Sequence, residues 1–267
     1  MTIQSTSQYK NNFNHMKVTE QAQKKSAKEL ASGKKVNSAA DDAVALSISQ
    51  KLMKEAKSLK AGSNNISYGI DATNIMDGGL AGISSSLGDI EQNTVRAMNG
   101  LYSESDRAIL QEANKQTVET INHSINQADY NGKKLLDGST GDMNIYTGTA
   151  SATISEADAK SAMAGLENFD ISGNPDKISK EAIDDTYSKL SDMRSQVGAE
   201  TNGLEHAYSV NNNTEENVTA AQSRKEDTDF AKSVSKMKSS QVVNQAQTMV
   251  LKNQMNDQEN LVNKMFQ

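Results

Sequence analysis

Side chains that could perform acid–base, nucleophilic or metal chemistry are few in this chain and far apart. The histidines are His15, His123 and His206. None of them belongs to a ligand spacing such as H-E-x-x-H, so we interpret each as a solvated or packing residue. The acid pairs Asp41-Asp42 and Asp184-Asp185 fall where helices are expected to begin, and carboxylates there stabilise a helix N-terminus. These residues predict a protein that is not an enzyme and has no metal site or cofactor.

Other features exclude further classes of chemistry and of partner. Cysteine is absent, which removes disulfides, thiolate ligands and thiol nucleophiles. No glycine-rich phosphate-binding motif follows a predicted strand. The net charge is -6 with both signs interspersed, so we expect no nucleic-acid partner. The first residues lack the apolar core of a signal peptide and no later segment resembles a membrane span, so an exported chain would leave without a cleaved signal.

Composition predicts long helices rather than a thick globular core. Of the 267 residues, 35% are hydrophobic and 4% aromatic, with no tryptophan and one proline, Pro175. Such values are typical of helices that bury a narrow stripe and leave most of their circumference in water. The predicted fold is mainly α: a long antiparallel helical bundle or coiled-coil rod, with a small β-hairpin region in the middle of the chain.

Helical periodicity begins near the N-terminus. A weakly amphipathic helix is expected from about Tyr9 to Leu30, and a second helix from about Asp42 to Asn99. The second helix carries a heptad seam that should pack against another helix. The seam consists of Leu59, Ile66, Met76, Leu80, Ile83, Leu87 and Ile90. Glycines interrupt this helix, which indicates either local bending or the close approach of another helix backbone. They are Gly62, Gly69, Gly78, Gly79, Gly82 and Gly88.

The middle of the chain is expected to leave the helical pattern. A third helix should begin at Ser105 or Asp106 and reach about Asp129, followed by a loop of turn residues. Residues 139–176 form the one region predicted to be non-helical, and two short strands are expected in it. These strands are 144–149 and 152–154.

Helices return in the C-terminal part. From about Ile178 apolar residues recur every seven positions, and Asn211 fills one slot, where a polar residue usually fixes register at some cost in stability. This second seam consists of Ile183, Leu190, Val197, Leu204 and Val218. A final helix is expected from about Asp229 to Phe266. The simplest packing folds the chain back on itself, so that the N- and C-terminal helices lie side by side.

A short break between the first two helices, residues 33–42, has the composition of a joint. Gly33 can adopt the left-handed conformation that ends a helix. Asn37, Ser38, Asp41 and Asp42 offer oxygen atoms and negative charge to the free amides of the next helix. We call residues 33–42 the joint.

Several short stretches of the sequence are distinctive. Residues 29–43 read ELASGKKVNSAADDA, and residues 131–138 read NGKKLLDG. The C-terminal part contains RSQVGA at 194–199, NVTAAQSR at 217–224 and DTDFA at 227–231, with NQA at 244–246. Together these stretches resemble bacterial flagellin, the subunit of the flagellar filament, whose patterns include LSSG-x-x-IN-x-A-x-DDAAG and FNG-x-x-LL-x-G.

The resemblance implies a subunit of two parts. The inner part, residues 1–40 and 228–267, would form a coiled coil in the core of the filament. Its filament-core residues would be Phe13, Met16, Leu30, Phe230, Val234, Met237 and Val250. The outer helical rod would consist of residues 41–138 and 178–227, separated by the central region 139–177, and the joint would connect the two layers. Because this central region is too short for a large variable domain, a smooth filament is predicted.

The resemblance also implies partners and a location. The main partner would be the chain itself, in a helical homopolymer that serves motility, and a flagellar secretion chaperone and the filament cap would be further partners. Export through the flagellum's own apparatus would make the protein secreted, extracellular and part of the bacterial flagellum.

Two segments depart from the family's patterns. The N-terminus does not reproduce the usual M-x-IN-x-N-x-x-AL. The segment read by flagellin-sensing Toll-like receptors, LQR-x-R-ELA-x-Q in sensed flagellins, is LGDIEQNTVR at residues 87–96. Asp89, Glu91 and Asn93 replace arginines and a leucine there, which should weaken receptor binding. We therefore hypothesise poor recognition by this receptor; the alternative is neutral change on a solvated helix face.

Two other functions remain open from the sequence. The hook-filament junction protein shares the terminal patterns but is present in few copies and usually has a larger middle region. A secreted flagellin-like adhesion or signalling module would retain the rod and lack polymerisation.

Overall fold

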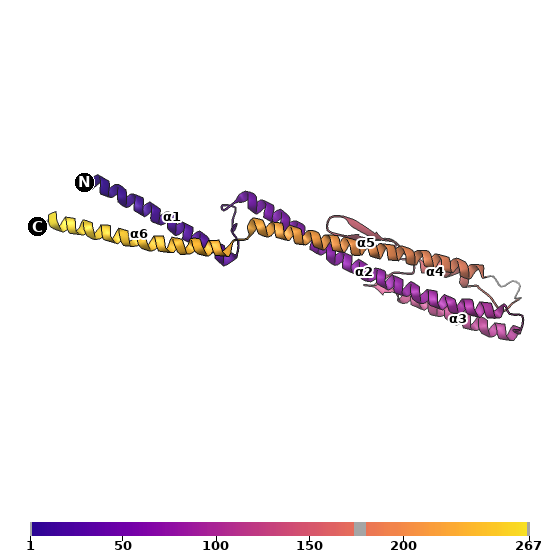
Figure 1. Cartoon of the computed structure of the whole chain (residues 1–267). Helices are drawn as coiled ribbons and strands as arrows, with labels where there is room; N and C mark the ends of the chain where they lie inside the picture. The colour runs from indigo at the N-terminus through magenta and orange to yellow at the C-terminus, as the bar shows by residue number, and fades with distance from the viewer. Residues whose placement is uncertain (1, 174–179, 266–267) are drawn as a thin grey trace. The chain divides into compact units, whose positions relative to one another are not determined.

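The computed structural model of the chain describes residues 2–173 and 180–265 (Figure 1). Six α-helices dominate these residues, with two small antiparallel hairpins between the third and fourth. This confirms the mainly α fold with a small β-hairpin region. Pro175 lies outside the described residues. The elements are α1 Thr2–Ser32, α2 Ala43–Ala97, α3 Glu104–Gln127, β1 Asp129–Tyr130, β2 Lys133–Lys134, β3 Met143–Tyr146, β4 Ser151–Ile154, α4 Ala159–Met163, the 3₁₀ helix η1 Ala164–Leu166, α5 Glu181–Glu226 and α6 Phe230–Met265.

The chain divides into two compact units, which are described separately. The first contains the residues up to 54 and those from 217 onward, and the second contains residues 55–216. In the first unit, Asn12 Nδ2 donates to Gln254 Oε1 at 3.1 Å and Asn244 Nδ2 donates to Gln23 Oε1 at 2.8 Å. Residue numbers rise along α1 as those of their partners fall along α6. The two terminal helices therefore run antiparallel, side by side (Figure 1).

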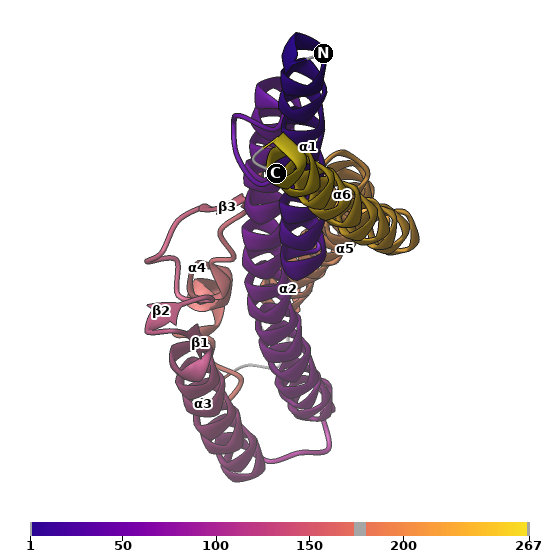
Figure 2. The same cartoon turned by 90° about the vertical axis from the view of Figure 1, so that its left-hand side faces the viewer.

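The second unit is held together by the antiparallel packing of α2 against α5. Arg194 Nε lies 2.9 Å from Asp77 Oδ1, and Lys180 Nζ lies 2.7 Å from Glu91 Oε1. Apolar side chains of both helices enter one buried cluster that extends past these ion pairs, and α3 adds its own apolar side chains. Figure 2 shows α3 beside the second half of α2, with the β1–β2 hairpin at its C-terminal end. Removal of this apolar surface from water is the main term that stabilises the unit.

The β3–β4 hairpin places its tip on α2 and α5. Thr147 O accepts from Asn211 Nδ2 at 2.5 Å, and Gly148 O accepts from Ser58 Oγ at 2.8 Å. Gly62 permits this approach, because a Cβ atom there would lie 2.0 Å from Thr147 O. The hairpin tip therefore depends on a helix position without a side chain.

The glycines of α2 have no single role. At Gly62 the close partner is the hairpin backbone rather than another helix, and at Gly79 a Cβ atom would lie 2.6 Å from Leu136 Cδ1. At Gly78 and Gly82 nothing lies within 4 Å of such an atom. Close approach thus accounts for some of these positions and leaves others unexplained.

The third helix begins earlier than predicted. Its N-cap is Ser103, not Ser105 or Asp106. Ser103 Oγ accepts from Asp106 N at 3.2 Å, and Asp106 Oδ2 accepts from Ser103 N at 3.0 Å. This reciprocal capping box makes Asp106 the third helical residue instead of the cap.

The middle of the chain contains more regular structure than predicted. The loop after α3 is a hairpin whose turn residues, Asn131 and Gly132, have φ of 50° and 78°. Asn-Gly is the usual dipeptide of such turns, so a sequence signal for this hairpin was present. Within the region predicted to be non-helical, α4 begins after Asp158, whose Oδ1 accepts from Ser161 N at 2.8 Å. It is too short to produce a periodic pattern.

The two predicted strands are present with shifted bounds. Strands β3 and β4 pair from Met143 opposite Ile154 to Tyr146 opposite Ser151. The first strand ends before Thr147, because Thr147 N donates to Ala150 O at 2.8 Å and closes a turn.

Candidate functional site

The joint is a backbone-paired connection in the first unit. After α1 ends at Ser32, Gly33 has φ of +70°, the left-handed conformation expected from the sequence. Gly33 O accepts from Thr228 N at 2.9 Å, and Lys35 N donates to Glu226 O at 2.7 Å. The joint therefore lies against the short link between α5 and α6. Backbone hydrogen bonds connect the segment that follows α1 to the segment that follows α5.

Only one of the expected helix caps acts as a cap. Asp42 Oδ1 accepts from Ala45 N at 2.8 Å at the start of α2. Asp41 Oδ2 instead accepts from the backbone amides of Asn37 at 3.1 Å and Ser38 at 2.9 Å, and the Ser38 hydroxyl lowers the pKa of Asp41. Asn37 Nδ2 donates to a carbonyl inside the joint. The prediction that Asn37, Ser38 and Asp41 bind the free amides of α2 is wrong. These residues instead close a turn before that helix begins.

The carboxylate of Glu226 is the charged centre of the joint. Its side chain is 8% exposed, and Oε1 accepts from Lys34 Nζ at 2.5 Å. Oε2 accepts from Ser49 Oγ at 2.5 Å and from Gln222 Nε2 at 3.1 Å. The hydrogen bond from Lys34, followed by that from Ser49, lowers the pKa of Glu226 to about 2. Its burial could not be predicted from the sequence, because nothing in a helical pattern separates one buried glutamate from many exposed ones.

This arrangement predicts acid sensitivity of the joint. The pKa of Glu226 is lowered from 4.5 to about 2 in the folded chain, so its ionised form stabilises the fold above pH 4.5. That contribution is lost as the pH falls through about 2. We expect Glu226→Gln to lower the free energy of unfolding by roughly 2–3 kcal/mol at pH 7, and the difference from wild type to shrink steadily below pH 4.5.

Urea unfolding followed by circular dichroism between pH 7 and pH 2.5 measures this difference. Glu216→Gln, which neutralises an exposed glutamate on the same helix, is the control and should change little at any pH. An equal, pH-independent effect of both substitutions would contradict the assigned role of Glu226.

All but one of the seam residues predicted on α2 and α5 are buried. Ten of them share one buried cluster, namely Ile66, Met76, Leu80, Ile83, Leu87, Ile90, Ile183, Leu190, Val197 and Leu204. Leu59 is 2% exposed but lies outside that cluster, and Val218 is half-buried. Asn211 is also buried and holds the hairpin tip, so the polar slot has a defined partner.

The three receptor-segment residues differ in their surroundings. Asp89 is exposed. Glu91 is half-buried and paired with Lys180, and Asn93 Nδ2 donates to Asn114 Oδ1 at 2.9 Å. Glu91 and Asn93 therefore have contacts within the chain that arginine or leucine would not reproduce.

The proposed filament-core residues do not form an apolar core between α1 and α6. Phe13, Phe230, Val234 and Val250 are exposed by 46%, 57%, 41% and 47%. The others, Met16, Leu30 and Met237, are half-buried. Further apolar side chains of the pair are exposed as well, namely Val18, Val242, Val243, Met249, Met255 and Val262. Much of the apolar surface of the terminal helices thus faces away from their mutual contact.

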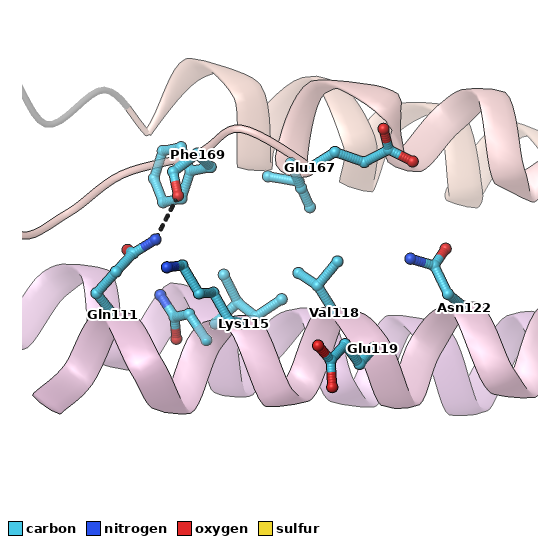
Figure 3. Close-up of a pocket in the computed structure, with 10 residues that line it drawn as sticks. Gln111, Lys115, Val118, Glu119, Asn122, Glu167 and Phe169 are labelled. Atoms are coloured by element: carbon cyan, nitrogen blue, oxygen red, sulfur yellow. Dashed lines mark hydrogen bonds between the residues drawn. The ribbon is translucent and has the colours of Figure 1, made fainter.

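A groove of about 280 Å³ lies in the second unit between α3 and the segment after η1 (Figure 3). Figure 3 shows Lys115 and Val118 of α3 facing Glu167 and Phe169. Gln111 Nε2 donates to Phe169 O at 2.8 Å and fastens that segment to α3. The side chains that line the groove include no serine, threonine, cysteine or histidine.

The described residues contain neither a metal-ligand cluster nor a membrane-spanning helix. Within 2–173 and 180–265, no three His, Asp or Glu side chains are grouped so as to hold a metal ion. None of the described helices combines the length and apolarity needed to cross a bilayer.

Two family models match the chain on either side of its centre. The bacterial flagellin N-terminal helical region matches residues 3–140, and the bacterial flagellin C-terminal helical region matches residues 180–265. A flagellin of Halalkalibacterium halodurans is 31% identical over 233 residues, covering 85% of this chain and 86% of the relative. The flagellar filament 31.3 kDa core protein of Treponema maltophilum is 30% identical over 255 residues, covering 88% and 89%.

Solved structures share the fold at lower identity. The crystal structure of Bacillus cereus flagellin has a TM-score of 0.50 at 22% identity, covering 55% of this chain and 88% of that one. A putative flagellar hook-associated protein of Vibrio parahaemolyticus has a TM-score of 0.60 at 16% identity, covering 70% and 100%. At these identities the likeness concerns the fold alone.

Proposed function

We propose, on the premise that this chain belongs to the bacterial flagellin family, that it polymerises through α1 and α6 into the flagellar filament used for motility. Family membership supports a structural subunit of a flagellar filament. The proposal adds that the terminal helices provide the contacts between copies, that residues 1–40 and 228–267 form the inner layer, and that the joint connects it to the outer layer.

One observation carries this proposal: the paired terminal helices leave large apolar side chains in water. Phe230 and Met249 are 57% and 68% exposed although both lie on a long helix that already has a partner. Burying one such side chain contributes about 1.5–3 kcal/mol. Contacts between unlike surfaces of identical copies that do not close into a ring produce a helical filament. Exposed apolar side chains on both terminal helices are suited to such contacts.

Sedimentation of the purified chain tests the proposal. Under polymerising conditions the full-length protein should pass from the supernatant to the pellet above a critical concentration and return on dilution. Protein that stays in the supernatant at every concentration would favour the secreted adhesion or signalling module, which keeps the fold without polymerisation.

The hook-filament junction protein is the second candidate, because its family shares this architecture. The hook-associated neighbour supports it at the level of the fold only. A filament subunit should account for most of the protein in isolated filaments, whereas a junction protein should be present in few copies. Counting copies by mass spectrometry separates the two functions.

We further propose that export proceeds through the flagellar apparatus with a secretion chaperone and that the filament cap assists assembly. The resemblance to flagellin supports these partners. They are tested by co-purification of the chain with each partner from cells blocked in assembly.

Weak recognition by flagellin-sensing Toll-like receptors is a separate prediction. Asp89 is exposed at a position where sensed flagellins have an arginine. Glu91 is paired with Lys180, and Asn93 is hydrogen-bonded to Asn114. A charge reversal at a receptor contact costs several kcal/mol, so we expect a half-maximal dose at least roughly 100-fold above that of a well-sensed flagellin. Reporter cells dosed with purified monomer measure this, and equal potency would contradict the prediction.

A further inference from the structure

Three Asn-Gly dipeptides occur in the second unit, each in a different backbone conformation. Asn99 lies in the turn between α2 and α3, Asn131 in the turn of the β1–β2 hairpin, and Asn202 inside α5. All three asparagines are exposed to water. In such a dipeptide the side-chain amide can react with the backbone nitrogen that follows, because glycine has no side chain to shield that nitrogen. Since all three sites are exposed, the backbone conformation decides which of them reacts.

The reaction is an intramolecular deamidation that needs only water as co-reactant. The glycine nitrogen attacks Cγ of the asparagine, the bond between Cγ and Nδ2 breaks, and Nδ2 leaves as ammonia with the proton of the glycine nitrogen. The product is a five-membered succinimide. Water then opens this ring at either carbonyl carbon and gives aspartate or isoaspartate. The rate depends on how often the glycine nitrogen and Cγ are close together and correctly oriented.

Two of the three dipeptides are held in conformations that oppose this attack. Gly203 lies within the 46 residues of α5, where a backbone N–H donates to the carbonyl four residues earlier. Its nitrogen must leave that hydrogen bond to react. Asn131 and Gly132 have φ of 50° and 78°. A left-handed asparagine also has a positive ψ, which turns the nitrogen of the next residue away from its own Cβ atom, so Cγ of Asn131 stays out of reach.

We propose that Asn99 is a deamidation site whose own turn promotes the reaction. Leu101 N donates to Asn99 Oδ1 at 3.0 Å, which folds the side chain of Asn99 back over the peptide unit of Gly100. Tyr102 N donates to Asn99 O at 3.0 Å and closes the turn. In the part of the chain that the structure describes, no backbone carbonyl accepts from Gly100 N. The attacking nitrogen is therefore free while Cγ is held near it.

The hydrogen bond from Leu101 also stabilises the transition state of the attack. When the Gly100 nitrogen bonds to Cγ, negative charge develops on Oδ1, and Oδ1 is the atom to which Leu101 N donates. A backbone N–H that already points at a developing oxyanion lowers the barrier. Deamidation places one new negative charge in the turn between α2 and α3, and isoaspartate also lengthens the backbone there by one methylene group. This inference goes beyond the proposed function, because it concerns a turn of the second unit and holds whether or not the chain polymerises.

Tryptic peptide mapping by mass spectrometry measures the conversion at each site. Trypsin cleaves after lysine and arginine, so the peptides 97–107, 116–133 and 195–224 carry one Asn-Gly dipeptide each. The full-length chain is incubated in mildly alkaline buffer, with and without concentrated urea. In urea the three asparagines should convert at similar rates. In native buffer, Asn99 should convert at least about as fast as in urea, whereas the rates at Asn131 and Asn202 should fall at least roughly tenfold.

Gly100→Ala is the variant that should block the site. No described residue apart from its chain neighbours lies within 4 Å of its Cβ position, and its φ is outside the left-handed region, so the turn should persist. The added methyl group hinders the attacking nitrogen, and conversion of Asn99 should slow at least roughly tenfold. Gly203→Ala is the matched control. Its Cβ position is equally free, and it should leave the conversion of Asn99 unaltered.

Circular dichroism at 222 nm checks that both variants retain their helices. Two results would overturn the proposal. One is conversion of Asn131 or Asn202 as fast as that of Asn99 in native buffer, and the other is an unchanged rate at Asn99 in Gly100→Ala. Since polymer formation is not measured, failure of the proposed function would affect neither result.

Discussion

Gly62→Ala is expected to lower the free energy of unfolding of the chain by about 2–4 kcal/mol, although alanine is the better helix former by about 1 kcal/mol. The added Cβ atom would lie 2.0 Å from Thr147 O and 2.6 Å from Gly148 N. Both are backbone atoms, so no flexible side chain can move aside. The hairpin tip has to leave α2.

Leaving α2 also breaks the contacts that hold the tip. The hydrogen bonds from Asn211 Nδ2 to Thr147 O and from Ser58 Oγ to Gly148 O are lost, and Asn211 is a buried amide. A buried amide without a partner costs about 1–3 kcal/mol. The substitution therefore acts through steric overlap and an orphaned polar group together.

Gly82→Ala is the matched control for this prediction. It lies on the same helix, and nothing is within 4 Å of its Cβ position. Only helix propensity should change there, so we expect stabilisation by up to about 1 kcal/mol. Urea unfolding monitored at 222 nm measures both variants. Opposite signs are expected, and similar effects of the two substitutions would contradict the assigned docking of the hairpin.

Deleting residues 1–40 is expected to abolish polymerisation. The deletion removes α1 and most of the joint, and with them the partner of α6 and the exposed apolar side chains of Phe13 and Val18. The second unit keeps its buried cluster, whose residues all lie within 66–204, so the truncated chain should stay helical by circular dichroism. Polymers formed by this truncated chain would refute the role of the terminal helices.

A double substitution tests the same contacts in the full-length chain. Phe230→Ser/Val250→Ser removes two apolar side chains that are 57% and 47% exposed, so the monomer should lose little stability. If other copies cover these residues, the polymer loses about 3 kcal/mol, and the critical concentration should rise by roughly 100-fold. Lys232→Ser/Lys252→Ser, at exposed positions of the same helix, is the control. Sedimentation measures the critical concentration of both variants.

The parts of the fold that follow a long repeat could be predicted from the sequence. The seam of Ile66, Leu80 and Leu87 recurs over many turns, so its burial follows from spacing alone. The short α4 and the hairpin of Asn131 and Gly132 span too few residues to show a period. Only local turn and capping residues indicate these elements in the sequence, and such residues are common throughout the chain.

Contacts between distant segments could not be predicted. Glu226 meets Lys34 and Ser49 only after α5 returns to the joint, and its own neighbours in sequence give no sign of burial. Gly62 likewise gains its role from a hairpin far along the chain. Spacing identified the terminal helices but not the polar contact of Asn244 with Gln23 between them, because a weak apolar stripe does not reveal which face meets the partner.

Negative-stain electron microscopy of the purified full-length protein under polymerising conditions tests most directly whether the terminal helices make this chain a filament subunit. Long filaments of uniform diameter are predicted for the full-length chain, and none for the chain without residues 1–40. Single particles or closed rings from the full-length chain, or filaments from the truncated one, would contradict the proposed function.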